Sequence, residues 1–232
     1  MVDLSSRDLA DLLADEIRPL PVGTRIMSEH QIMGRFGVTR AVARGALDHL
    51  ASRYLVRRTQ GAGTFVHRRL DYVISRDRAP SLHQEAAASG WSTKTFVLGA
   101  EPLPPPDLVA TKLGTGSLPC TRLQRLAYLD DAVSTLLTEW IAPGIADHVE
   151  VGLAVFDSLD ELLRGLRWSP ERRWCRVTVD EPPDHVRTHL DLESEAQAWH
   201  VTTLSVDASS GRPLFVSSNW TRLDLVRFVC EL

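Results

Sequence analysis

The first pattern along the chain is a run of apolar residues at helical spacing near the N-terminus. Its members are Leu9, Leu12, Leu13 and Ile17. Pro19 and Pro21 follow the run directly, and proline does not continue a helix. The pattern therefore predicts a helix that ends before Pro19.

Two short helices joined by a tight turn are predicted next. Ser28 and Gln31 have the spacing of a capping box, which starts a helix at Glu29, and Gly37 ends that helix. Thr39 then caps a second helix after only two more residues. Helices joined this tightly cross at a steep angle, as in a helix-turn-helix.

A β-hairpin with a glycine-rich tip is predicted after the second helix. Residues 54–58 and 64–66 have strand character, and Gln60 to Gly63 forms the turn between them. Gly61 and Gly63 permit positive φ angles and let the backbone approach another surface closely. A hairpin in this position is expected to act as a wing against the phosphate backbone or in the minor groove of DNA.

Short strands in hairpins dominate the pattern beyond residue 80, with short helices between them. The expected strands are 95–101, 122–129, 133–141, 176–181, 199–207 and 214–221, and the chain closes with 225–232. The expected helices are 82–88, 107–112, 159–166 and 184–190. This order of elements predicts an α+β domain around an antiparallel sheet.

Charge changes sign along the chain. The N-terminal 69 residues hold eleven arginines and seven acidic residues, whereas the remainder holds 15 basic and 23 acidic residues. Within 30–69, eight arginines face one acid, Asp48, although the whole chain has a net charge of −4. Local positive charge on an acidic protein is typical of a nucleic-acid-binding domain. We predict a DNA-binding domain over 1–67, a polar linker over 68–79 and a second domain over 80–232.

The overall composition is that of an ordinary globular protein, with 44% hydrophobic and 24% charged residues. No run is long enough to span a membrane, and the polar, acidic N-terminus is not that of an export signal. Cys120, Cys175 and Cys230 are widely spaced, which predicts no disulfide framework. His185 and His189 have helical metal-site spacing but lack an evident third ligand. We expect a reduced, cytoplasmic protein with no membrane partner, no cofactor and no bound metal.

The candidate chemistry for DNA recognition lies on the second predicted helix. Arg40 and Arg44 are one turn apart near its N-terminal end, on the side away from its apolar residues. This end of a recognition helix touches base edges in the major groove. Arginine can bind guanine through two hydrogen bonds or clamp a phosphate.

The segment RIMSEHQIMGRFGVTRAVARGALDHLASRYLVRRTQGAGTFV resembles the winged-helix domain of the GntR family of bacterial transcription regulators. The resemblance covers roughly residues 8–67. It implies that Arg40 and Arg44 are recognition-helix arginines, that Thr39 is the cap, and that two glycines form the wing tip. The predicted DNA-binding residues are Ser28, His30, Thr39, Arg40, Arg44, Gln60, Gly61, Ala62 and Gly63.

Two positions depart from the family pattern. His30 stands where the family usually has an arginine, and Ala62 stands where a basic residue usually lies between the wing glycines. Both differences remove positive charge from the predicted DNA surface. Fewer phosphate contacts predict weaker non-specific affinity and a shallower salt dependence.

The remainder of the chain resembles the UTRA effector domain of the HutC-type branch of the GntR family, over roughly residues 79–232. This resemblance implies a chorismate-lyase-like fold with a pocket for a small, polar and often anionic effector. The tail TRLDLVRF, residues 221–228, is close to the motif that ends these domains. Together with the segment 70–72, it is most similar to the repressors of phosphonate utilisation.

An anion pocket needs an arginine together with hydroxyls or free backbone N–H groups. The predicted effector-binding residues are Ser81, Arg125, Thr138, Ser217 and Arg222. The resemblance places a second pocket arginine at Ala127, a glutamate at Leu137 and a tyrosine at Val226, so these polar groups are absent here. Their loss favours a more apolar ligand or a pocket filled by side chains. Arg222 has an alternative role as the partner of Asp224 in holding the tail.

These observations predict a DNA-binding transcription regulator that represses bacterial metabolic or transport genes. It is expected to bind a palindromic double-stranded DNA operator as a homodimer, because two half-sites mirror a two-fold axis. A small anionic effector such as a phosphonate is expected to release it or tune it. Two alternatives remain: a constitutive regulator whose C-terminal domain only dimerises, and a lyase-like enzyme, for which no catalytic residue is predicted.

Overall fold

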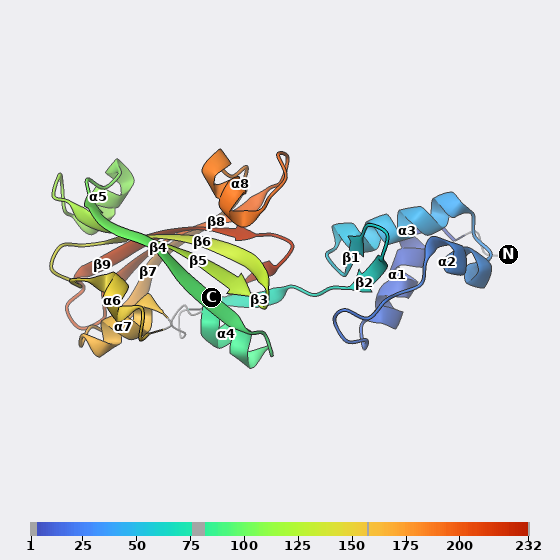
Figure 1. The fold of residues 1–232 in the computed structure, drawn as a ribbon, viewed down its shortest axis with the longest axis horizontal. Helices are drawn as coiled ribbons and strands as arrows, with labels where there is room; N and C mark the ends of the chain where they lie inside the picture. The colour runs from blue at the N-terminus through green and yellow to red at the C-terminus, as the bar shows by residue number, and fades with distance from the viewer. Residues whose placement is uncertain (1–3, 76–81, 157, 232) are drawn as a thin grey trace. The chain divides into compact units, whose positions relative to one another are not determined.

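The computed structural model describes residues 4–75, 82–156 and 158–231. The chain forms two compact units, of which unit 1 ends at Arg69 and unit 2 begins at Leu70. Figure 1 shows a helical unit 1 with a small hairpin, and a unit 2 built around a large sheet.

Unit 1 contains the helix-turn-helix and the wing that the sequence predicts. Its elements are α1 (Ser6–Ile17), α2 (Glu29–Phe36), α3 (Arg40–Ser52), β1 (Val56–Thr59) and β2 (Gly63–Val66). The capping box at Ser28 is formed in both directions, because Gln31 N donates to Ser28 Oγ and Ser28 N donates to Gln31 Oε1. Gly37 ends α2 in the left-handed conformation, with a φ of 65°.

The core of unit 1 joins one side of each helix to the hairpin. Its buried apolar members include Leu9, Leu13, Ile17, Ile32, Leu47, Leu50, Val56 and Val66. Leu12 was expected on the apolar side of α1, but it is 47% exposed. The buried stripe runs through Leu9 and Leu13 and includes Ala10 and Ala14, so it drifts away from position 12.

Helices α1 and α3 approach each other closely at Gly45. A Cβ atom at this position would stand 2.6 Å from Ser6 Oγ and 2.9 Å from Ser6 Cβ. Replacing Gly45 with alanine should therefore force the two helices apart and destabilise unit 1 by about 1–3 kcal/mol. Denaturant unfolding followed by circular dichroism would measure this change.

Gly34 provides the matched control, because it also lies inside a helix and a Cβ atom added there would meet no other atom within 4 Å. Gly34→Ala should stabilise the protein by roughly 0.5–1 kcal/mol through the lower entropy of its unfolded chain. Equal stabilisation by Gly45→Ala would contradict the close contact with Ser6.

Unit 2 is organised by a six-stranded antiparallel sheet with the strand order β4-β5-β6-β9-β8-β7. The strands are β4 (Thr93–Leu103), β5 (Cys120–Leu129), β6 (Ala132–Ile141), β7 (Pro170–Asp180), β8 (Ala198–Asp207) and β9 (Pro213–Arg222). Every strand predicted for this sheet is present, and most are longer than the pattern indicated. The expected α+β class with an antiparallel sheet is confirmed.

Short helices cover both faces of this sheet. One face carries α5 (Asp107–Leu113) and α8 (Asp184–Leu190), whereas α4 (Leu82–Ala88), α6 (Val149–Gly152) and α7 (Leu159–Gly165) lie on the other side (Figure 1). Helix α6 was not predicted, because four residues are too few to show a helical period. None of the helices in the described ranges is long and apolar enough to cross a membrane.

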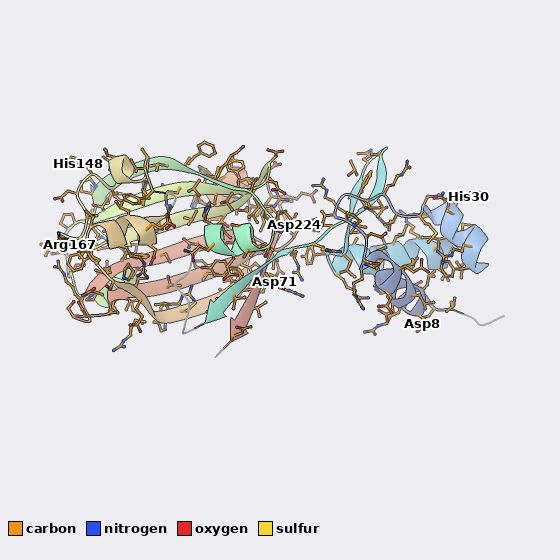
Figure 2. All side chains as sticks on the ribbon, turned by 90° about the horizontal axis from the view of Figure 1, so that it is seen from below. Asp8, His30, Asp71, His148, Arg167 and Asp224 are labelled. Carbon is orange, nitrogen blue, oxygen red and sulfur yellow. The ribbon has the colours of Figure 1, made fainter. Side chains whose placement is uncertain are left out.

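The predicted linker over 68–79 is wrong for its central part. Strand β3 (Leu70–Ser75) pairs in parallel with β10 (Val226–Glu231), the last strand of the chain. Leu70 is 1% exposed and Ile74 is 7% exposed, so alternate residues of β3 enter the core. Arg227 also donates two hydrogen bonds, of 2.7 and 2.5 Å, to the carboxylate of Asp71 (Figure 2). The partner strand lies 156 residues away, which explains why the local pattern did not indicate it.

Candidate nucleic-acid interface and effector pocket

The N-terminal turns of α3 present the two arginines expected to contact DNA. Ala43, Leu47 and Leu50 bury the opposite side of the helix in the core of unit 1. Arg40 and Arg44 are both exposed, since they project from the other side. Thr39 caps the helix by accepting a 3.4 Å hydrogen bond from the backbone N–H of Val42. The N-terminus of α3 and the two arginines thus share one end of the helix.

Helix α2 begins beside this end of α3. Arg40 Nε lies 3.2 Å from Glu29 Oε2, although the Arg40 side chain remains 78% exposed. Ser28 is exposed, but its hydroxyl is occupied by the capping box. His30 is exposed on α2, as Figure 2 shows. An ion pair this open is weak in water, so Glu29 holds Arg40 only loosely.

The wing has the backbone that its glycines predict. Gly61 has a φ of 73° and Gly63 a φ of 126°, both in the region that side chains disfavour. Gln60, Gly61 and Ala62 are exposed at the tip. Arg25, which no pattern in the sequence indicated, packs its guanidinium over Gly63, where its Nε would lie 2.9 Å from an added Cβ atom. A backbone bridge between Arg25 and Phe65 holds this arginine on the wing.

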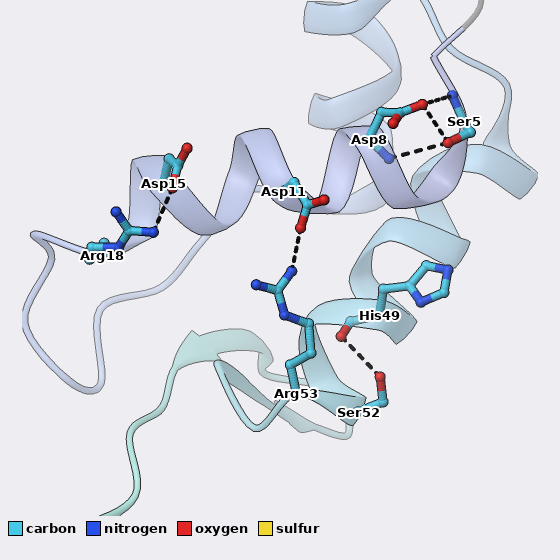
Figure 3. A network of polar contacts seen from close by, with 8 residues as sticks. All are labelled: Ser5, Asp8, Asp11, Asp15, Arg18, His49, Ser52 and Arg53. Atoms are coloured by element: carbon cyan, nitrogen blue, oxygen red, sulfur yellow. Dashed lines mark hydrogen bonds and ion pairs between the residues drawn. The ribbon is translucent and has the colours of Figure 1, made fainter.

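Most arginines counted in the 30–69 segment have a structural partner. The ion pairs are Arg35 with Glu16, Arg40 with Glu29, Arg53 with Asp11 and Arg58 with Asp48. Arg68 donates to the carbonyls of Arg18 and Leu20, and Arg69 lies 4.5 Å from the centre of the Tyr54 ring. Figure 3 shows Arg53 reaching from the end of α3 to Asp11 on α1.

Arg44 and Arg57 remain from this set, and neither has an acidic partner within the described residues. The charge count therefore overstated the positive surface available to DNA. Several acids that neutralise it, including Glu16 and Asp11, lie outside the counted segment and fold back onto it. On α3, Arg44 is thus an exposed arginine to which no acid of the described chain is bound.

Unit 2 contains a cavity of about 130 Å³ between the sheet and the elements α4, α7, β3 and β10. Alternate residues of four neighbouring strands face it. They are Arg125 and Ala127 on β5; Thr135, Leu137 and Glu139 on β6; Val201, Thr203 and Ser205 on β8; and Ser217, Asn219 and Thr221 on β9. Because side chains alternate along a strand, the neighbouring residues point to the face that carries α5 and α8.

This alternation separates the predicted effector-binding residues into two groups. Arg125 and Ser217 line the cavity, whereas the prediction that Thr138 and Arg222 do so is wrong. Thr138 lies between two lining residues of β6 and so faces the other side of the sheet. Ser81 lies outside the described residues.

Arg222 takes the alternative role suggested by the sequence. It binds Asp224 through Nε at 3.0 Å and Nη2 at 2.7 Å, and Nη1 donates to the Leu190 carbonyl at the end of α8. The hydrogen bonds to Asp224, which Figure 2 labels, raise the pKa of the Arg222 guanidinium. This arginine therefore ties the start of the tail to α8.

Arg125 is held by a carboxylate that the sequence-based reasoning did not assign. Its Nε donates to Glu139 Oε2 at 2.9 Å and its Nη2 donates to Glu139 Oε1 at 2.5 Å. Both side chains are 5% exposed. The resemblance placed a glutamate at Leu137, but the carboxylate lies two residues further along, on the same face of β6. Arg125 is consequently neutralised within the wall and is not a free anion-binding group.

Arg172 on β7 is the second arginine of the cavity wall, and no pattern in the sequence singled it out. Its Nε and Nη1 atoms are buried and have no hydrogen-bond partner among the described residues. Its Nη2 atom donates only a long 3.4 Å hydrogen bond to the Tyr72 hydroxyl. Burial raises the pKa of Tyr72 to about 12, so this phenol stays protonated.

The described residues contain no group of three or more side chains arranged to hold a metal ion. Within the predicted histidine pair, His189 Nδ1 lies 2.6 Å from the backbone oxygen of His185. That nitrogen is therefore engaged inside α8.

Comparison with known families decides the identity of both units. The family model described as bacterial regulatory proteins, gntR family, matches residues 6–66, and the UTRA domain model matches residues 88–227. The chain belongs to the GntR family and carries a UTRA domain. GntR regulators bind DNA and UTRA domains bind small effectors, so this GntR–UTRA protein is a transcription regulator.

Individual relatives agree with this assignment. The HTH-type transcriptional regulator GgaR of Escherichia coli strain K12 is 24% identical over 211 residues, covering 90% of this chain and 82% of GgaR. The HTH-type transcriptional regulator Rv0792c of Mycobacterium tuberculosis is 28% identical over 148 residues, which cover 63% of this chain and 54% of Rv0792c.

Solved structures share the fold over nearly the whole chain. PhnF from Mycobacterium smegmatis superposes with a TM-score of 0.67 at 20% identity, covering 97% of this chain and 98% of PhnF. The possible transcriptional regulator YydK from Bacillus subtilis gives a TM-score of 0.57 at 16% identity, with 99% of each chain covered.

Proposed function

We propose that this GntR–UTRA protein is a repressor that binds a palindromic operator as a homodimer. The observation that carries the proposal is the exposed, acid-free guanidinium of Arg44 on the N-terminal part of α3, next to Arg40 and beside a glycine-tipped wing. This arrangement fits a recognition helix in the major groove with a wing on the adjacent backbone. Two copies related by a two-fold axis match two half-sites.

The proposal includes release by a small anionic effector, of which a phosphonate is one class, that enters the cavity of unit 2. Tyr72 on β3 lines this cavity, and β3 begins at the residue after the end of unit 1. A ligand on the cavity wall therefore acts on the strand that continues directly from the DNA-binding unit. To lower operator affinity, the effector must prefer the arrangement of the dimer that does not fit both half-sites.

A footprint of the full chain on the DNA upstream of its own gene tests this proposal. We expect protection of two inverted half-sites whose centres lie roughly one helical turn, 10–10.5 bp, or a multiple of it apart. Sedimentation of the same sample should give the mass of a dimer. Protection of a single half-site by a monomer, or no sequence preference at all, would contradict the proposal.

The constitutive alternative, in which unit 2 only dimerises, predicts a cavity closed by side chains. The open volume of about 130 Å³ and the unpartnered atoms of Arg172 favour a sensor instead. The lyase-like alternative gains no support, because the families that match this chain are those of transcription regulators and not of enzymes.

A further inference from the structure

The cavity of unit 2 contains a guanidinium with unused hydrogen-bond donors. Arg172 Nε and Nη1 are buried and bind no other group of the described chain, and Nη2 reaches only the Tyr72 hydroxyl. Arginine stays protonated in proteins, so this group cannot become neutral to relieve its burial. A buried charge without a partner is costly, and an anion that enters the cavity would compensate it.

The other charged groups of the wall already have partners. Arg125 and Glu139 bind each other through two hydrogen bonds. Asp160 accepts a 2.7 Å hydrogen bond from Arg164 Nε. Arg172 is thus the arginine of the described wall that is left without a carboxylate, and an entering anion meets one available positive charge rather than two.

The rest of the wall sets the character of the ligand body. Large apolar side chains contribute much of it, namely Leu82, Leu137, Val201, Phe215 and Phe228. Thr203 and Ser217 add hydroxyls, but these are bonded to each other at 2.5 Å. A cavity of about 150 Å³ holds benzene in another protein, so about 130 Å³ suits a body near the size of one six-membered ring.

We propose that the cavity binds a small organic anion with a single negative charge on an apolar body, and that Arg172 is its anion-binding group. A carboxylate is the fitting chemistry, because the second N–H of Nη2 forms a parallel pair of donors with Nε or with Nη1, and this pair matches two oxygens. Asn219 Oδ1 also lies buried on this wall with no partner in the described part of the chain, and it accepts from a hydroxyl or amine that the effector carries in addition. The inference rests on the proposed function, since it identifies the effector class of the same regulator.

The test compares three ligands that share a phenyl ring: benzoate, its neutral planar analogue benzamide, and phenylphosphonate, which has a tetrahedral headgroup, at a pH where it carries two charges. Thermal unfolding of the full chain is measured with each ligand in large excess, for the wild type and for Arg172→Met. Arg173→Met is the matched control, because Arg173 is a neighbour on the same strand that does not line the cavity.

Benzoate should raise the unfolding midpoint of the wild type and of Arg173→Met by several degrees, and benzamide should not. The affinity of benzoate for Arg172→Met should be roughly 10- to 100-fold lower than for the wild type, which is the loss expected for charge-assisted hydrogen bonds. Without ligand, Arg172→Met should unfold at a higher temperature than the wild type by about 2–4 °C, because a buried uncompensated charge is gone.

A lower midpoint for ligand-free Arg172→Met would overturn the inference, because the arginine would then be structural. So would equal stabilisation of Arg172→Met and the wild type by benzoate, stronger stabilisation by benzamide or phenylphosphonate, or no stabilisation by benzoate. A gel shift on the operator separates the two proposals. If a ligand releases the operator equally well from the wild type and from Arg172→Met, only this inference is contradicted. If benzoate binds through Arg172 but leaves operator affinity unchanged, effector control is contradicted instead.

Discussion

Replacing Arg44 with alanine should lower the affinity of the dimer for its operator about 30- to 25,000-fold, because one base-contacting arginine is lost in each of the two half-sites and each costs roughly 1–3 kcal/mol. Arg44 is exposed on α3 and has no acidic partner in the described chain, so its full charge is available to DNA. Arg40→Ala should cost less, because Arg40 must first give up Glu29 at 3.2 Å. Fluorescence anisotropy at one fixed salt concentration would measure both losses.

Arg18→Ala supplies the control for lost charge. Arg18 is an exposed arginine of the same unit that pairs with Asp15 (Figure 3). It follows the C-terminal end of α1, whereas Ser6, which meets Gly45, lies at the N-terminal end of that helix. Its replacement should leave operator affinity nearly unchanged. If Arg44→Ala behaved like Arg18→Ala, the assignment of α3 as the recognition helix would fail.

Replacing Glu139 with alanine should destabilise unit 2 by about 3–5 kcal/mol, because it leaves Arg125 buried without its carboxylate. Both side chains are only 5% exposed, so bulk water solvates the guanidinium left behind poorly. For a domain of this size the unfolding midpoint should fall by roughly 6–20 °C, at about 2–4 °C per kcal/mol. Scanning calorimetry of the full chain would show the shift in the transition of unit 2.

The double variant Arg125→Met with Glu139→Leu is the informative companion. It removes both charges together and fills the space with apolar side chains, so it should recover most of the lost stability. A double variant as unstable as Glu139→Ala would show that the pair contributes through its geometry rather than through charge compensation.

The helix-turn-helix was predictable because its signals are local. Ser28 with Gln31 and Thr39 before α3 set the helix starts through contacts only three residues long. Gly37 set the end of α2 through its own backbone angle. Such signals depend on neighbouring residues alone, so the helix boundaries could be placed before any tertiary contact was known.

The pocket was harder to predict because it depends on the register of strands far apart in sequence. A shift of one residue decides on which face of a sheet a side chain lies. Thr138 and Arg222 were predicted on the cavity face, but they lie on the opposite face. Glu139 was missed because its partner, Arg125, is fixed only by the pairing of β5 with β6. Arg172 reaches the cavity from the far edge of the sheet, and no local pattern reports this.

Separation along the sequence also limited the prediction of which arginines are free to bind DNA. The arginines of 30–69 looked free because their acidic partners on α1, Asp11 and Glu16, precede them in the chain. Only the packing of α1 against α2 and α3 brings these groups together. A count of charges in a window therefore predicted the sign of the surface but not which arginines are available.

The parallel pairing of β3 with β10 has a consequence for the protein during its synthesis. Asp71 and Arg227 are 156 residues apart, so at about 5–20 residues per second the ribosome needs roughly 8–30 s to make the partner of β3. Unit 1 contains all of its own strands and can fold during that interval. A nascent or prematurely terminated chain is therefore expected to hold a finished DNA-binding unit before the strand that completes its sensor exists.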